Sequence, residues 1–471
     1  TKLSPKPNMA NQGSEQITRY WANQLADLQS IDFTTSYRGT RWGHTIRQKQ
    51  KQKPPSWDSI SNHAVGATKT TWAAIAVRSP MAGRMMAAFM AIRFWLGLVP
   101  IPSGEHRTGQ CRKHPLAETG KILLHGDDDE GILRYLEHGY RLPPIYGDEL
   151  TISIQKEKLR GRIHKGAWPQ LHVVKPGAPV QVGPFTLEAV QMGHTLSSSG
   201  LVVKAGGMAA FMTGDFKLDQ TTLTPSTDLK RIAEMGRKKE IDALFLDSTR
   251  ADKQGHPTPE ADVREAVRNI AALHPNKRIN IVVETGNAEA LARAAWVASQ
   301  QSRVYVHHGS SIERRLRAMN KSGLDLQGLT KSEALITASG PTQLAAKLSP
   351  SYVLNVLAGV NGERSSVLSR VARGEYEHFS AGPDDVFIFS SSVRPWNAAK
   401  LEENIRLLRE QGVTQIYRDE PGKPALDSSG HEHGDGLKAV AALVQPRSVI
   451  VGLHGGNQQR ESCRQLFAAL A

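Results

Sequence analysis

Short apolar runs alternate with helical segments from about residue 259 to residue 417, and this alternation constrains the fold more than any other feature of the chain. Apolar runs at Arg278–Val283 and Val386–Ser390 have the length of strands, whereas Pro259–Leu273 and Ala398–Glu410 have the length of helices. Strands that alternate with helices build a largely parallel sheet covered on both faces. The same pattern predicts strands at Val304–Val306, Ser351–Leu357 and Thr414–Tyr417 and a helix at Ala288–Ser299.

Strand signals dominate the preceding part of the chain. Gln181–Met192 indicates a hairpin through a Gly-Pro turn, and Leu201–Lys204 is expected to pair with Met208–Met212 around two glycines. Ile241–Leu246 is a continuous apolar run followed by Asp247, as expected of a buried strand with a polar tip. We also predict short strands at Lys121–Leu124 and Leu150–Ile154 and a short helix at Gly131–His138.

The positive charge of the chain is unevenly distributed. The 471 residues suffice for two or three domains and carry a formal net charge of +14. Residues 1–120 hold 16 Lys and Arg against 6 Asp and Glu, whereas the remainder holds 43 against 39. Within this basic front end, Arg38–Lys53 mixes cations with Gln and Trp, which suits phosphate contact combined with base stacking. A solvated, disordered arm is the alternative.

Two observations exclude other classes of protein. Two cysteines exclude a disulfide scaffold and a four-Cys zinc ribbon. Met81–Pro100 has the length of a membrane span, but it contains Arg84 and Arg93, so we predict a buried segment and no contact with a membrane. Thr1–Tyr20 is polar and lacks the apolar core of a signal peptide, which predicts a cytoplasmic protein.

Polar residues follow several of the predicted strands, and α/β folds place their sites at such positions. A single Gly-His pair is more often structural than functional, so each short segment is weak alone. The loop that runs from His125 through Glu130 (HGDDDE) differs, because its consecutive carboxylates repel one another unless they are exposed or bind a cation. An acidic surface loop that caps the following helix is the structural alternative. The other polar segments contain Gly193-His194, Gly214-Asp215, Asp247-Ser248-Thr249, Gly430-His431 and His454-Gly455.

The order and spacing of these segments resemble the β-CASP branch of the metallo-β-lactamase superfamily, and in detail the ribonuclease J family. The resemblance covers about 350 residues, from near Ile122 almost to the end of the chain. It implies an αββα metallo-β-lactamase sandwich interrupted by an inserted β-CASP α/β domain. The matching segments are Leu124–Ile132, Leu142–Leu150, Met192–Gln220, Leu246–Pro259, Gly359–Glu375, Ser390–Asn397, Ser429–Glu432 and Leu453–Gly456.

The resemblance also implies roles for individual residues. The family holds two divalent metal ions, usually zinc, which activate a water molecule for attack on an RNA phosphodiester. Asp215 would bridge the two ions, Asp247 would orient groups of the site, and His431 would contact the scissile phosphate and protonate the leaving oxygen. The metal ligands implied are His125, Asp127, Asp129, Glu130, His194, Asp215 and His454, the catalytic residues are Asp215, Asp247 and His431, and the RNA or phosphate contacts are Ser248, Ser311, Asn361 and His431.

The implied ligand set departs from the family in two positions, because Asp127 and Glu130 stand where the family has histidines. Oxygen ligands shift the metal preference from zinc toward manganese or magnesium. Four carboxylates also cancel the charge of two divalent ions, so the centre should acidify water and attract phosphate less than the family's does. Three further departures lie outside the ligands: Ser310 stands for an Arg, Trp396 for a Gly and Gly456 for a Glu.

We therefore expect an RNA phosphodiester hydrolase, an exonuclease in the 5′-to-3′ direction or an endonuclease, with weakened or altered-metal activity. The alternatives are a non-catalytic RNA-binding relative and a small-molecule metallohydrolase of the same superfamily, such as a lactonase or thioesterase. The resemblance implies a homodimer or homotetramer. The predicted organisation is a basic arm at 1–60, a metallo-β-lactamase domain at 61–252 that returns at 428–471, and a β-CASP domain at 253–427.

Overall fold

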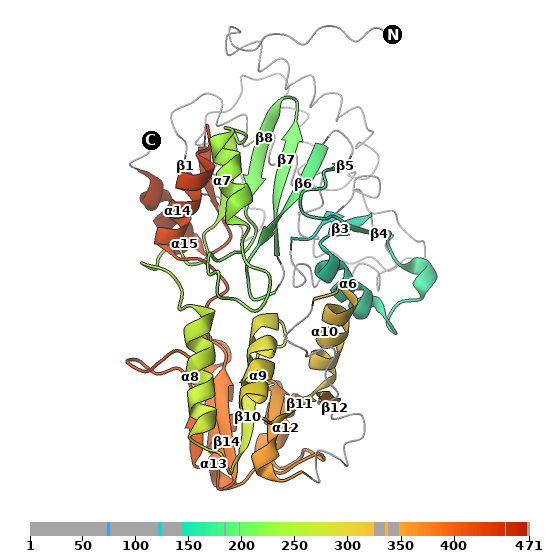
Figure 1. Cartoon of the computed structure of the whole chain (residues 1–471), viewed down its shortest axis with the longest axis vertical. Coiled ribbons are helices and arrows are strands. Elements are labelled where there is room, and N and C mark those ends of the chain that lie inside the picture. The colour runs from blue at the N-terminus through green and yellow to red at the C-terminus, as the bar shows by residue number, and fades with distance from the viewer. Residues whose placement is uncertain are drawn as a thin grey trace, which may run out of the picture.

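The computed structural model describes residues 73–75, 121–124, 144–182, 185–196, 198–324, 335–337, 348–447 and 449–468, and two large sheets organise them (Figure 1). A seven-stranded sheet lies in one lobe, here called the sandwich lobe, and a six-stranded sheet lies in the other, the parallel lobe. In spatial order, the seven strands are β1 (Ala73–Ile75), β16 (Val449–Leu453), β9 (Ala243–Asp247), β8 (Met208–Met212), β7 (Ser198–Ala205), β6 (Phe185–Met192) and β5 (Val180–Val182).

The predicted hairpins of the sandwich lobe are confirmed. β5 pairs antiparallel with β6, and Val182 lies opposite Phe185. β7 pairs antiparallel with β8, and the turn between them places Gly206 and Gly207 at φ values of 55° and 82°. Glycine adopts this left-handed backbone without the steric penalty that a side chain imposes, which explains the two glycines.

The chain leaves the seven-stranded sheet after β9 and returns to it with β16, and the segment from α8 to β15 between them builds the parallel lobe. All strand pairs of the six-stranded sheet are parallel, as the alternation of strands and helices predicted. Its strands in spatial order are β12 (Leu335–Thr337), β11 (Val304–His308), β13 (Val353–Ala358), β10 (Arg278–Val283), β14 (Asp385–Ser390) and β15 (Gln415–Tyr417). Its helices are α8 (Glu260–Ala272), α9 (Ala288–Gln300), α10 (Ser310–Lys321), α12 (Val367–Ala372) and α13 (Ala398–Glu410), with a short 3-10 turn at Pro350–Tyr352.

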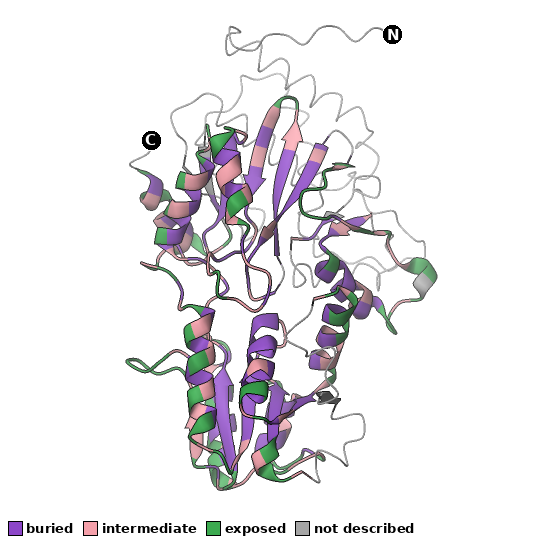
Figure 2. Ribbon diagram, in the orientation of Figure 1, coloured by how far each residue is buried: buried purple, intermediate pink, exposed green. Residues whose placement is uncertain are grey.

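The sandwich lobe has the layer order of an αββα sandwich. One face of the seven-stranded sheet packs on α7 (Leu229–Arg237), α14 (Gly434–Val444) and α15 (Asn457–Phe467) through a shared apolar cluster. The other face packs on a three-stranded sheet of β2 (Lys121–Ile122), β3 (Ile145–Gly147) and β4 (Leu171–Val173), which α6 (Glu149–Leu159) covers in turn. Figure 2 shows the buried residues concentrated in the strands and on the inner faces of the helices.

The predicted strand at Leu150–Ile154 is wrong, because these residues form the first half of α6. Asp148 caps the helix by accepting a 2.8 Å hydrogen bond from the backbone N–H of Thr151. Leu150, Ile152 and Ile154 alternate with polar residues that are also buried, because the helix packs against a sheet on one side and the parallel lobe on the other. The alternation therefore imitated a strand.

Apolar and ionic contacts join the two lobes. Leu150, Ile154 and Leu196 of the sandwich lobe belong to the same apolar cluster as the core of the parallel lobe. Glu157 of α6, whose side chain is 3% exposed, accepts hydrogen bonds from two cations of α10, Arg317 at 3.2 Å and Lys321 at 2.6 Å.

A second set of ion pairs, here called the interlobe network, is almost fully buried. Lys217 follows β8, and its Nζ lies 2.5 Å from Oε1 of Glu260 at the start of α8. The other carboxylate oxygen of Glu260 lies 2.6 Å from Nη1 of Arg293 on α9, and Nη2 of Arg293 lies 3.6 Å from Oδ1 of Asp427. The network thus extends from the sandwich lobe into the parallel lobe.

Several predictions lie outside the described residues: the basic arm, the segment Met81–Pro100 and the helix at Gly131–His138. The predicted domain boundaries stay predictions. Among the residues described, no helix combines the length and the apolar character needed to cross a bilayer.

Candidate active site

The seven-stranded sheet brings four sequence-predicted site residues to one edge. β8, β9 and β16 are parallel neighbours, and β6 runs in the same direction because two antiparallel pairings separate it from β8. Their carboxyl ends therefore meet at the same edge. His194 follows β6, Asp215 follows β8, Asp247 ends β9 and His454 follows β16.

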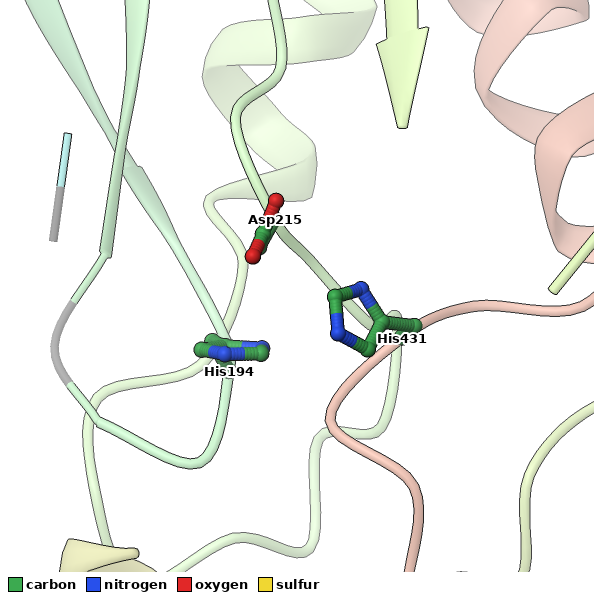
Figure 3. A group of neighbouring side chains, drawn as sticks. All are labelled: His194, Asp215 and His431. Atoms are coloured by element: carbon green, nitrogen blue, oxygen red, sulfur yellow. The ribbon is translucent and has the colours of Figure 1, made fainter. Parts of the chain in front are cut away.

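A fifth residue, His431, joins them from the segment that precedes α14 (Figure 3). One potential ligand atom from each of His194, Asp215 and His431 lies within 4.8 Å of the others. The same holds for a second set that contains Asp215, Asp247 and His454. Figure 3 shows the first set arranged around one space, with each side chain coming from a different segment. Asp215 belongs to both sets.

Asp247 fixes the orientation and the charge of His431. Its Oδ2 lies 2.6 Å from Nδ1 of His431, and its Oδ1 accepts hydrogen bonds from the backbone N–H and hydroxyl of Thr249 at 2.9 Å and 2.6 Å. Burial alone would lower the pKa of His431, but the charge of Asp247, the hydrogen bond to it and the charge of Asp215 raise that pKa above its ordinary value. The raised pKa favours the protonated form of His431.

His194 is held by a backbone carbonyl. Its Nδ1 lies 2.7 Å from the oxygen of Gly430, and because a carbonyl only accepts, Nδ1 carries the proton and Nε2 keeps its lone pair. This is the tautomer that a metal-ligating histidine needs. Gly430 permits the approach, since a Cβ there would lie 2.6 Å from Cε1 of His194.

His454 occupies a backbone conformation that is unusual for a residue with a side chain. Its φ is 61°, in the left-handed region, and its carbonyl accepts a 2.7 Å hydrogen bond from the hydroxyl of Ser248. Its Nδ1 lies 2.6 Å from Oδ1 of Asp215. Ser248 thus holds the backbone of His454, and Asp215 holds its imidazole.

The remaining predicted ligands, His125, Asp127, Asp129 and Glu130, lie outside the described residues. Of the predicted phosphate contacts, Ser248 is fully buried and donates to His454, whereas Ser311 and Asn361 line a separate groove. All of these roles stay predictions.

That groove has a volume of about 1050 Å³ and lies between α6 and the loops at the carboxyl ends of β10, β11 and β13. Its described lining contains six basic residues against three acidic ones. Gln155, which is 1% exposed, also lines it, and neither polar atom of its side-chain amide has a hydrogen-bond partner within the described part of the chain. The basic residues of the lining are Lys158, Arg160, Arg162, Arg314, Arg315 and Arg370.

The groove adjoins the candidate site through the start of α9. Gly286 lines the groove, and three residues later the backbone N–H of Glu289 donates a 3.1 Å hydrogen bond to the carbonyl of Thr195, next to His194. Ser311 and Asn361 of this groove were among the predicted phosphate contacts, but sequence reasoning missed its cations, because they come from segments far apart in the chain and because Leu150–Ile154 was predicted as a strand. The run of cations at Lys158, Arg160 and Arg162 was the one available signal.

Comparison with known proteins places these features in context. Residues 276–408 match the family described as the β-CASP domain of ribonuclease J. The chain is 28% identical to ribonuclease J of Thermus thermophilus over 336 residues, which cover 69% of this chain and 56% of that protein. It is 27% identical to ribonuclease J of Sinorhizobium meliloti over 71% of this chain and 57% of that protein, and 26% identical to ribonuclease J 1 of Streptococcus pyogenes over the same shares.

The chain thus spans little more than half the length of these relatives. Among solved structures, it is similar to a protein of unknown function from Enterococcus faecalis, with a TM-score of 0.50 and 15% sequence identity. That similarity covers 76% of this chain and 80% of the other and concerns the fold alone.

Proposed function

We propose that this chain, which is a ribonuclease J-like β-CASP protein, hydrolyses RNA phosphodiester bonds with the help of divalent metal ions. The observation that supports this proposal most is the convergence of His194, Asp215, Asp247, His431 and His454 at one edge of the seven-stranded sheet. Imidazole and carboxylate groups are the ligands that divalent zinc and manganese take in proteins.

The described residues fit such metal ions. His194 offers Nε2 because Gly430 holds the proton of Nδ1, and Asp215 offers carboxylate oxygen to both sets of potential ligands. His454 completes the second set. Bound divalent ions would polarise the phosphate and lower the pKa of a water molecule. We further propose that the loop from His125 to Glu130 contributes its carboxylates, so that manganese or magnesium supports activity better than zinc.

The other residues of the site would move protons and position the substrate. The carboxylate of Asp247 keeps Nδ1 of His431 protonated, and the raised pKa of His431 suits a group that gives a proton to a departing oxygen. The cationic groove would bind the phosphates of single-stranded RNA and lead the chain toward His194.

The proposal can be tested by metal analysis combined with an RNA cleavage assay. The substrate is a single-stranded RNA with a 5′-monophosphate, incubated with manganese, magnesium or zinc. We expect cleavage that is strongest with manganese, and a loss of at least about a hundredfold in His454→Ala and Asp215→Asn. His164→Ala is the matched control, because this exposed histidine lies in a loop outside the site and should retain full activity.

Three outcomes would contradict the proposal. RNA binding with neither metal nor cleavage indicates a non-catalytic RNA-binding relative. Esterase or lactonase turnover without RNA binding at moderate salt indicates a small-molecule hydrolase. Equal cleavage by wild type and His454→Ala places the chemistry elsewhere in the chain.

A further inference from the structure

An exposed aromatic residue stands beside the cationic groove. Trp396 is 67% exposed and lies in the segment 391–397 that follows β14. The guanidinium carbon of Arg394 lies 5.4 Å from the centre of its ring, which is the distance of a cation–π contact. Isolated exposed aromatic side chains are common, so the surroundings of this one decide its meaning.

The backbone that carries Trp396 is fixed by hydrogen bonds. The backbone N–H of Arg394 donates to Oδ1 of Asn397 at 2.8 Å, and Nδ2 of Asn397 donates to the carbonyl of Val360 at 3.3 Å. Asn397 is 1% exposed, and on the other side the hydroxyl of Ser392 donates to Asp427 at 2.7 Å. The indole therefore projects from a loop whose position is set before any ligand binds.

The contact with Val360 and an ion pair of Arg394 place the loop at the edge of the groove. Val360 lines the groove, and so does Glu284, whose carboxylate lies 3.0 Å from Nη2 of Arg394. The groove supplies cations for phosphates, and the buried amide of Gln155, unpaired within the described residues, can bond to a base edge or a phosphate.

We infer that Trp396 is a stacking platform for one nucleobase of single-stranded RNA whose neighbouring phosphates lie in the groove. This inference rests on the proposed function, because it takes RNA as the ligand. An exposed indole that an arginine holds beside a cationic groove combines the two elements by which proteins bind single strands. Arg394 contacts the ring through the cation–π interaction, and Trp396 remains 67% exposed and accessible to a base.

Binding measurements with the full chain test the inference, with fluorescence anisotropy of a labelled, 5′-monophosphorylated RNA of ten nucleotides in the absence of added metal. Trp396→Ala should weaken binding roughly 5- to 150-fold, the range of one base stacked on an aromatic side chain. Trp396→Phe should stay within about threefold of wild type, since it keeps an aromatic face. Tyr352→Ala is the control, because Tyr352 is 59% exposed on the parallel lobe and does not line the groove.

A set of RNAs, each lacking one base, separates stacking from other effects. Removal of one particular base should weaken binding by wild type but not by Trp396→Ala, and the dependence on salt should be the same for both proteins, because no phosphate contact changes. Equal affinity of wild type and Trp396→Ala for the complete RNA refutes the stacking inference while the proposed function stands. A wild-type chain that binds no RNA refutes the proposed function itself. Reduced self-association of Trp396→Ala with unchanged RNA affinity would assign the indole to an interface between copies of the chain.

Discussion

Replacement of Glu260 by Gln tests whether the interlobe network supports the fold. Glu260 is 1% exposed, and its two carboxylate oxygens lie 2.5 Å from Nζ of Lys217 and 2.6 Å from Nη1 of Arg293. The amide of Gln has nearly the same volume, so the variant removes a charge without creating a cavity. Lys217 is fully buried, and Glu260 is its ion-pair partner in the described part of the chain.

The expected loss follows from the burial of the cations. Glu260→Gln leaves Lys217 and Arg293 buried without the carboxylate that they share, and breaking a buried ion pair from one side costs about 3–5 kcal/mol. Arg293 retains Asp427 at 3.6 Å, so most of the uncompensated charge falls on Lys217. If this reasoning holds, Lys217→Met combined with Glu260→Gln should recover much of the loss, because the double variant leaves no unpaired charge at that end of the network.

Urea-induced unfolding followed by far-ultraviolet circular dichroism measures both effects. The matched control is Glu403→Gln on the exposed face of α13, where Glu403 pairs with Arg406 in water and its loss should leave the unfolding curve unchanged. The reasoning is refuted if Glu260→Gln unfolds at the same urea concentration as wild type. It is also refuted if the double variant is as unstable as Glu260→Gln, because the loss would not come from the unpaired charge of Lys217.

The structure also predicts the direction of change for two other substitutions, one that alters the pH dependence of stability and one that alters the candidate site. Burial raises the pKa of Asp148 to about 6 even though Thr151 donates to its carboxylate. An unfolded Asp titrates near 3.9, so between about pH 4 and 6 the folded state keeps a proton that the unfolded state has lost. The free energy of unfolding should therefore fall by on the order of 3 kcal/mol as the pH rises from 4 to 6. Asp148→Asn keeps a good helix cap and should remove this part of the pH dependence in urea titrations at pH 4, 5, 6 and 7; an unchanged slope would contradict the assignment. Gly430→Ala should displace His194, because the added Cβ would lie 2.6 Å from its ring, and should reduce metal content and cleavage together. Gly382→Ala, whose added Cβ meets nothing within 4 Å, should match wild type in both assays.

The sequence predicted those helices and strands for which the boundary residues and the spacing of apolar residues indicate the same type of element. The strand at Arg278–Val283 and the helix at Ala398–Glu410 have the predicted bounds, because the first is a continuous apolar run and the second has one apolar face between polar ends. The segment at Leu150–Ile154 misled because the helix is buried on opposite sides by two different partners. Asp148, a residue type that favours the N-terminal cap of a helix, was the local signal for a helix at this position.

The candidate site was predictable to the extent that strand order determines it. Residues at the carboxyl ends of strands with one direction meet wherever those strands become neighbours, which accounts for His194, Asp215 and His454. The pairing of His431 with Asp247 joins positions that are 184 residues apart, and no local pattern encodes it. The groove depends in addition on how α6 packs against α10, which is a property of the assembled lobes.

The edge of the seven-stranded sheet carries costs that a purely structural edge would not need. A left-handed backbone at a residue with a side chain costs roughly 1–2 kcal/mol, and His454 adopts it with φ at 61° where glycine would relieve the strain. Asp247, only 3% exposed, is a buried carboxylate that requires hydrogen bonds from Thr249 and His431 to be tolerated. Glycine in place of His454 would avoid the first cost, and an apolar side chain in place of Asp247 would avoid the second. Strain and buried charge that coincide at one edge of a sheet favour a chemical role for that edge.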